Sequence, residues 1–172
     1  PADYTYHSFP KIKPVVLLNA QVINWQQMSL LDGEANLFFE GTFTGKNLLT
    51  LQSFSDTLNI PLGNDREILV KREEDKKFSS SKFLGSKKET TRSWKITVRN
   101  NKSESIKIEL SDQIPVTTNE EIEISDIELQ GGKLEEETGK VTWNLTLSQG
   151  EQVEKIISYT VKHPKNRLLI VE

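Results

Sequence analysis

Two histidines, His7 and His163, are the only side chains suited to act as the general base of a Ser-His-acid triad. The Gly-x-Ser-x-Gly pattern that exposes a nucleophilic serine on a sharp turn is absent, and the serine run 79–81 lies in a charged stretch. His163 directly precedes Pro164, where a surface or capping role is the ordinary one. We therefore expect no catalytic residues and no enzyme. A hydrolase would require a pocket that places one histidine beside a serine and an acid.

Oxygen ligands for a metal ion come close together at one place in the chain. Asp56, Asn64 and Asp65 would offer carboxylate and amide oxygens to calcium if a hairpin brought them together. An Asn-Asp pair in a turn more often hydrogen-bonds its own backbone. The chain has no cysteine, no paired-histidine spacing and no EF-hand spacing. We therefore predict no metal site and no cofactor.

Aromatic side chains are the better candidates for binding. Tyr4, Tyr6 and Phe9 crowd the beginning of the chain, and Trp25 follows an apolar run. Exposed aromatic rings stack on sugars or anchor protein partners. Burial in a core is the alternative, and for Trp25 it is the favoured one. These four residues form the candidate binding surface.

Charge is distributed unevenly, although the net charge is only −3. The stretch 66–95 has ten Lys and Arg against five Asp and Glu, whereas the stretch 103–137 has two against eleven. These stretches are either solvated sheet faces, which we favour, or complementary surfaces. The absence of a general basic excess argues against a nucleic-acid partner.

No apolar stretch approaches the roughly 18 residues that a membrane-spanning helix needs. We therefore expect a chain that does not span a membrane with a helix. The beginning of the chain also lacks the basic and apolar regions of a signal peptide.

Apolar and polar residues alternate along most of the chain, and this period of two predicts β-strands. The runs 94–98 and 106–110 are separated by turn-forming residues, which predicts a hairpin. A second hairpin is expected around 63–65. The nearly continuous apolar run 15–23 is typical of a strand covered on both faces. The alternating apolar residues stand at even positions up to Ile124 and at odd positions from Ile127. This change of position predicts a bulge near Ser125 and Asp126.

Short strands with turn signals every 8 to 12 residues predict an all-β fold, an antiparallel β-sandwich that is immunoglobulin-like in its C-terminal part. The Lys-, Ser- and Glu-rich stretch 73–89 is the natural boundary, and we expect part of it to be either a hairpin excursion or mobile. We therefore predict a smaller β subdomain at 1–74 and an immunoglobulin-like sandwich at 75–172.

Several segments, in this order, resemble the C-terminal domain of the mucoidy inhibitor A family. They are 6–11 (YHSFPK), 18–20 (LNA), 24–25 (NW), 30–36 (LLDGEAN), 43–46 (FTGK), 56–58 (DTL), 62–65 (LGND), 70–73 (VKRE), 98–100 (VRN), 112–116 (DQIPV), 139–143 (GKVTW) and 159–164 (YTVKHP).

The resemblance implies a domain of unknown function, preceded in the full protein by a β domain and a coiled-coil-like region. It also implies that segment 1–74 is an incomplete part of the family domain. The family's name suggests a bacterial protein of the periplasm or cell envelope. No catalytic residue is implied.

These observations favour a non-catalytic structural or protein-interaction domain. Its partner would be another protein or the upstream part of its own chain. The alternative is a carbohydrate-binding module that acts on envelope or capsular polysaccharide.

Overall fold

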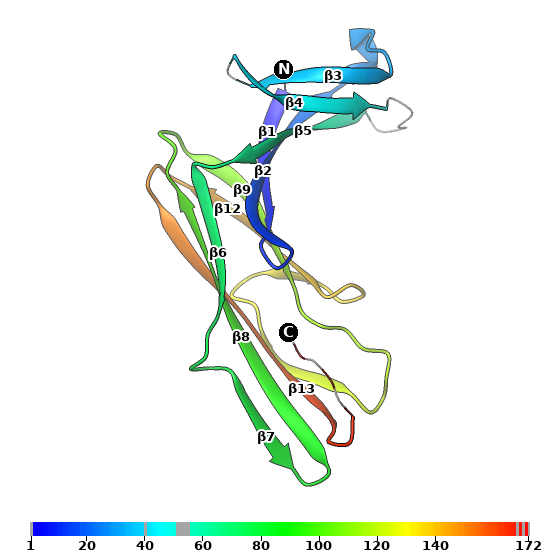
Figure 1. The fold of residues 1–172 in the computed structure, drawn as a ribbon, viewed down its shortest axis with the longest axis vertical. Helices are drawn as coiled ribbons and strands as arrows, with labels where there is room; N and C mark the ends of the chain where they lie inside the picture. The colour runs from blue at the N-terminus through cyan, green and yellow to red at the C-terminus, as the bar shows by residue number, and fades with distance from the viewer. Residues whose placement is uncertain (1, 40, 51–55, 168, 170, 172) are drawn as a thin grey trace.

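The computed structural model describes residues 2–39, 41–50, 56–167, 169 and 171. Two large β-sheets and one small hairpin account for most of these residues, and the only helix among them is the short 3-10 helix η1 (Trp25–Met28) (Figure 1). The sheets pack face to face, so the expected all-β sandwich is confirmed.

The larger sheet has six strands. Their spatial order is β11 (Lys133–Glu135), β12 (Lys140–Leu147), β9 (Ile106–Gln113), β1 (Ala2–Phe9), β2 (Lys13–Ile23) and β5 (Thr57–Asp65). All neighbours are antiparallel except β1 and β9, which pair in parallel from Tyr6 to Ser8. β1 therefore joins the hairpin it makes with β2 to strands far along the chain.

The second sheet has five strands. Its path is β10 (Glu123–Glu128), β13 (Gln152–Pro164), β8 (Lys87–Asn100) and β6 (Ile68–Glu74), with β7 (Ser80–Leu84) also paired to β8. β6 and β7 pair with successive parts of the long β8, and the β7–β8 hairpin extends at one end of the molecule (Figure 1). The expected hairpin excursion within 73–89 is confirmed.

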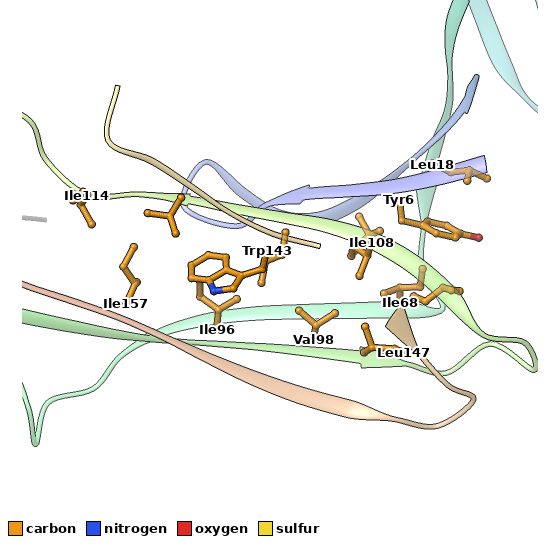
Figure 2. Close-up of a cluster of buried hydrophobic side chains, with 14 of the residues drawn as sticks. Tyr6, Leu18, Ile68, Ile96, Val98, Ile108, Ile114, Trp143, Leu147 and Ile157 are labelled. Atoms are coloured by element: carbon orange, nitrogen blue, oxygen red, sulfur yellow. The ribbon is translucent and has the colours of Figure 1, made fainter. Parts of the chain in front are cut away.

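The core lies between the inner faces of the two sheets, and each strand contributes alternate residues to it. Figure 2 shows Trp143 of β12 among side chains from both sheets, with Ile96 and Ile157 on the side of the second sheet. The Trp143 indole N–H donates to the Leu129 carbonyl at 2.8 Å, so this large ring is buried without losing its hydrogen bond.

A buried ion pair joins the sheets. Arg72 of β6 and Asp112 of β9 are linked by a 2.8 Å contact between Nε and Oδ2, and the Asp112 carboxylate is fully buried. The Arg72 guanidinium also lies 3.8 Å from the centre of the Trp94 ring. Both interactions fix Arg72 inside the sandwich.

The third sheet is a hairpin of β3 (Gly33–Phe39) and β4 (Thr42–Leu49). It lies over the end of the larger sheet that extends beyond the sandwich (Figure 1). Leu37 and Phe39 pack against the core, and the Phe39 ring meets Tyr4 edge-on at 5.4 Å. On the other face Phe38 and Phe43 are exposed and contact each other at 5.5 Å.

The two predicted hairpins are wrong. β8 and β9 belong to opposite sheets, as do β5 and β6. After β8 the chain crosses the sandwich, and Asn100 stabilises this crossing: its amide donates to the carbonyls of Glu104, Leu147 and Ser148 at 2.8 to 3.2 Å. The alternation of apolar and polar residues identifies a strand but not the strand it pairs with. The same face of a strand is buried whichever neighbour it has in the sheet.

The predicted bulge is confirmed. The pairing of β10 with β13 shifts register between Ser125 and Glu128. Asp126 adopts a φ of 50°, in the left-handed region. The extra residue returns Leu129 to the core face that Ile124 occupies, whereas Ile127 stays 42% exposed.

The division into 1–74 and 75–172 stays a prediction. Both large sheets combine strands from the two segments: β1, β2 and β5 lie beside β9, and β6 lies beside β8. The sheets are therefore continuous across position 74.

Only one face of β2 is covered, contrary to the expectation from its apolar run. Val16, Leu18 and Ala20 are buried against the core. Val15 is partly exposed, and Leu17 is 46% exposed on the opposite face. That face belongs to the groove described next.

Candidate interaction surface

The outer face of the larger sheet has a groove of about 530 Å³. Its floor and walls come from β1, the β1–β2 turn, β2, β9 and β12. The lining residues are His7, Ser8, Phe9, Ile12, Lys13, Val15, Leu17, Glu109, Ser111 and Lys140. We call this the outer groove.

Apolar side chains dominate one side of the outer groove. Ile12, in the β1–β2 turn, is 78% exposed, and Leu17 projects from β2 beside it. Phe9 and Val15 are partly exposed. A cluster of this kind leaves apolar surface in water, which is unfavourable unless something binds there.

Charged side chains form the other side. Glu109 of β9 lies 3.7 Å from both the His7 Nδ1 and the Lys140 Nζ. His7 Nε2 is also 3.0 Å from the Thr5 hydroxyl. The outer groove thus combines an apolar strip with a row of mixed charge, which suits an amphipathic segment.

The order Thr5–His7–Glu109 resembles that of a nucleophile, a base and an acid, but its geometry is unsuited to acyl transfer. The acid lies beyond hydrogen-bond distance from His7 and is shared with Lys140. Strand β1 is paired with β2, and around His7 also with β9, so its backbone amides are used in the sheet and do not form an oxyanion hole. Thr5, His7 and Glu109 therefore do not form a triad of the acyl-transfer kind.

The four aromatic residues of the candidate binding surface do not form one surface. Phe9 lines the outer groove, whereas Tyr4 is half-exposed and packs beside Phe39 of the small hairpin. Tyr6 and Trp25 are buried, 6% and 8% exposed, so neither ring offers a flat platform to a ligand. Tyr6 shares the inward face of β1, and Trp25 begins η1 at the turn after β2.

Tyr6 interacts with Lys102 and Asp65. Lys102, Asp65 and Glu67 form a polar cluster that lines a second, smaller pocket. Lys102 donates from its Nζ to Asp65 at 3.1 Å and to Glu67 at 3.3 Å. Burial opposes the charge of Lys102, but the hydrogen bond to Asp65 and the neighbouring charges outweigh it, so the pKa of Lys102 is raised. Burial also raises the pKa of Tyr6. The two carboxylates balance the charge of this ammonium, and the cluster links the β8–β9 connection to the β5–β6 connection.

The proposed calcium ligands are not brought together. Asp65 lies at the end of β5 beside Lys102, whereas Asp56 precedes the strand and accepts a hydrogen bond from Gln26 at 3.3 Å. Asp65 follows Asp56 by nine positions along an extended strand, a span of roughly 30 Å. Among the described residues no three His, Asp or Glu side chains are grouped as a metal ion would require.

His163 lies inside the sandwich and not at the surface where its position before Pro164 suggested. It is 2% exposed, with Nδ1 3.0 Å from the Pro164 carbonyl and Nε2 buried without a hydrogen-bond partner. His163 pairs with Lys88 of β8. It stands two positions after Val161 on β13 and both side chains are buried, so the two share the inward face of the strand. Within the described part of the chain, neither ring nitrogen of His163 is hydrogen-bonded to a serine or an acid.

Sequence reasoning missed Ile12 and Leu17 as surface residues. The run of apolar residues on β2 could have indicated them, because it predicted that the outer face of this strand is covered. The structure provides no cover for that face from the described part of the chain.

Among the described residues, no helix has the length and apolarity that crossing a membrane requires.

A family model for a domain of unknown function, DUF4139, matches residues 4–165. The match covers nearly the whole chain, so the chain belongs to this family. It matches no curated protein and no solved structure.

Proposed function

We propose that this chain is a non-catalytic protein-interaction domain that binds an apolar segment of another protein, or of the upstream part of its own chain, in the outer groove. The carrying observation is the uncovered face of β2. Its apolar run is typical of a strand covered on both sides, yet Leu17 and the neighbouring Ile12 are in water. A bound segment would supply the missing cover.

The charges of the outer groove would orient that segment. Glu109 accepts contacts from His7 on one side and Lys140 on the other, and all three lie beside the apolar strip. Such charges contribute to register and partner choice more than to affinity. An amphipathic helix or strand with apolar residues on one face therefore fits the groove best.

The biological setting follows from the resemblance to the mucoidy inhibitor A family. The order of the matching segments supports a place for this domain at the C-terminal end of a bacterial envelope-associated protein. A region with coiled-coil-like sequence upstream would provide amphipathic segments of the required kind.

Polysaccharide binding is the second candidate. The exposed rings of Phe38 and Phe43, in contact on the outer face of the small hairpin, favour it because sugars stack on such surfaces. Tyr4 is also half-exposed, although its ring packs against Phe39 on the other side of that hairpin.

The experiment is capture of tagged full-length protein from its own cell envelope, with and without protease treatment of the extract. Variants Ile12→Asp and Leu17→Asp place a charge in the outer groove and should reduce capture of a protein about tenfold or more. The matched control is Leu31→Asp, since Leu31 is 85% exposed and lies outside the groove.

Two outcomes would contradict the proposal. Equal capture by the groove variants and by Leu31→Asp would place the binding site elsewhere. Polysaccharide that survives protease and is lost in a Phe38→Ala variant would establish the second candidate.

A further inference from the structure

Parts of the basic stretch 66–95 and of the acidic stretch 103–137 lie at opposite edges of the second sheet, whereas β9 and β11 of the acidic stretch belong to the larger sheet. β7, with its flanking lysines, is at one edge, and β10 is at the other. Among the described salt bridges only that of Arg72 with Asp112 joins the two stretches. Within the second sheet, one edge strand therefore carries Lys82, and the other carries Glu123, Asp126 and Glu128.

A row of alternating charge runs across this sheet from edge to edge. Lys82 of β7 is paired with Glu89 of β8, Glu89 with Lys162 of β13, and Lys162 with Glu123 of β10. The Lys82 Nζ lies 2.7 Å from the Glu89 carboxylate, and the Lys162 Nζ lies 3.7 Å from it. The row begins with a lysine and ends with a glutamate, so each end complements the other.

Both edges are open to pairing. In the described part of the chain, β7 pairs only with β8 and β10 only with β13, which leaves one side of each without a neighbouring strand. All five residues of β7 are exposed, with Phe83 at 71%. On β10, Ile127 is 42% exposed. Each edge therefore carries an apolar residue as well as charge.

Strand direction fixes how two copies would join. The four strands β7, β8, β13 and β10 alternate in direction, because each neighbouring pair is antiparallel. A second copy in the same orientation places its β7 antiparallel to β10 of the first and its Lys82 beside Glu123. The contact is head-to-tail, so it repeats without closing.

We propose that this domain associates with a second copy of itself by adding β7 of one copy to β10 of the next, with Lys82 and Glu123 aligned across the junction. This contact uses the second sheet, whereas the outer groove lies on the larger sheet. It is independent of the proposed function, and either can fail without the other.

The test is sedimentation velocity of the chain over a concentration series at about 20 mM and about 500 mM NaCl. Association should appear at low salt and weaken at high salt, because exposed charges are screened beyond a few ångströms at high ionic strength. Lys82→Glu and Glu123→Lys should each abolish it, since each places like charges at the junction.

An equimolar mixture of the two variants is the decisive sample. Lys82 of the Glu123→Lys copy again meets Glu123 of the Lys82→Glu copy, so association should return. Thermal melts of each variant show that it is folded, and the pair Lys46→Glu and Glu34→Lys, on the small hairpin, is the matched control. A chain that is monomeric at low salt, association that persists in the single variants, or a mixture that stays monomeric would each overturn the proposal.

Discussion

The Arg72–Asp112 pair is the most strongly constrained polar contact between the sheets. Besides its 2.8 Å contact with Arg72, the Asp112 carboxylate accepts a hydrogen bond from the backbone N–H of Gln113 at 2.7 Å. A buried pair of this kind adds little compared with apolar residues of the same size, but the loss of one partner leaves the other charge unpaired.

Asp112→Ala should therefore lower the free energy of unfolding by about 3 to 5 kcal/mol. The double variant Arg72→Met with Asp112→Leu should lose clearly less. Glu34→Ala, which breaks the exposed pair with Lys46, should cost about 1 kcal/mol or less. Urea denaturation measures all three, and a double variant less stable than Asp112→Ala would contradict this account.

Alkaline pH should destabilise the fold through its buried tyrosines. Burial raises the pKa of both Tyr6 and Tyr159 above 10.0 in the folded state. As pH rises past about 10, the unfolded chain releases these protons first, so the folded state binds more protons and its stability falls. The raised pKa of Lys102 acts in the same direction, because its stabilising charge is lost as pH rises through the folded value.

The measurement is the free energy of unfolding between about pH 8 and pH 11.5. Stability should be level at the lower end and decline above about pH 10, and Tyr6→Phe and Tyr159→Phe should each reduce the decline by up to about 1.4 kcal/mol per pH unit. Variants that decline as steeply as the unmodified chain would show that these two phenols are not responsible.

At the level of elements, the turn before β12 depends on one glycine. Gly139 has a φ of 71°, and a Cβ built there would lie 2.3 Å from the Ile114 carbonyl oxygen. The Gly139 carbonyl also accepts a hydrogen bond from the Ile114 amide at 3.0 Å. This close approach connects the end of β9 to the start of β12.

Gly139→Ala should therefore be more destabilising than Gly150→Ala. Gly150 has a similar φ of 72° but open space around its Cα. The backbone conformation alone should cost about 1 to 2 kcal/mol at either site, and the clash should add to it only at Gly139. Thermal or urea unfolding of the two variants measures the difference, and equal losses would mean that the turn relaxes freely.

The strands themselves could be predicted from the sequence, and so could the Asp126 bulge, because alternation reports which face of a strand is buried. The pairing of the strands with one another could not be predicted from the sequence. The runs around Ile96 and Ile108 alternate as a hairpin would, yet the chain crosses the sandwich between them, held by hydrogen bonds from Asn100 that no pattern reveals.

The candidate surface was predicted only in part, for the same reason. Aromatic type does not distinguish a core ring from an exposed one, so Tyr6 and Trp25 are buried while Phe9 lines the outer groove. Leu17 and Ile12 became visible as surface residues only when the face of β2 was placed in space.

On the scale of the whole molecule, the two candidate contact surfaces lie on different sheets. The outer groove lies on the larger sheet, and the row from Lys82 to Glu123 crosses the second. A single domain thus has two faces with different chemistry, one suited to an apolar segment and one to a charged edge. Variants on each can be tested separately.

The parallel pairing of β1 with β9 also determines when the free edge of the N-terminal hairpin is covered during synthesis. Tyr6 pairs with Ile108, so the first strand waits for a partner about 100 residues later. At about 5 to 20 residues per second, a ribosome needs on the order of 5 to 20 s to supply it. Until then the N-terminal hairpin has an unpaired edge, which makes this interval the one in which a nascent chain most needs protection by a chaperone.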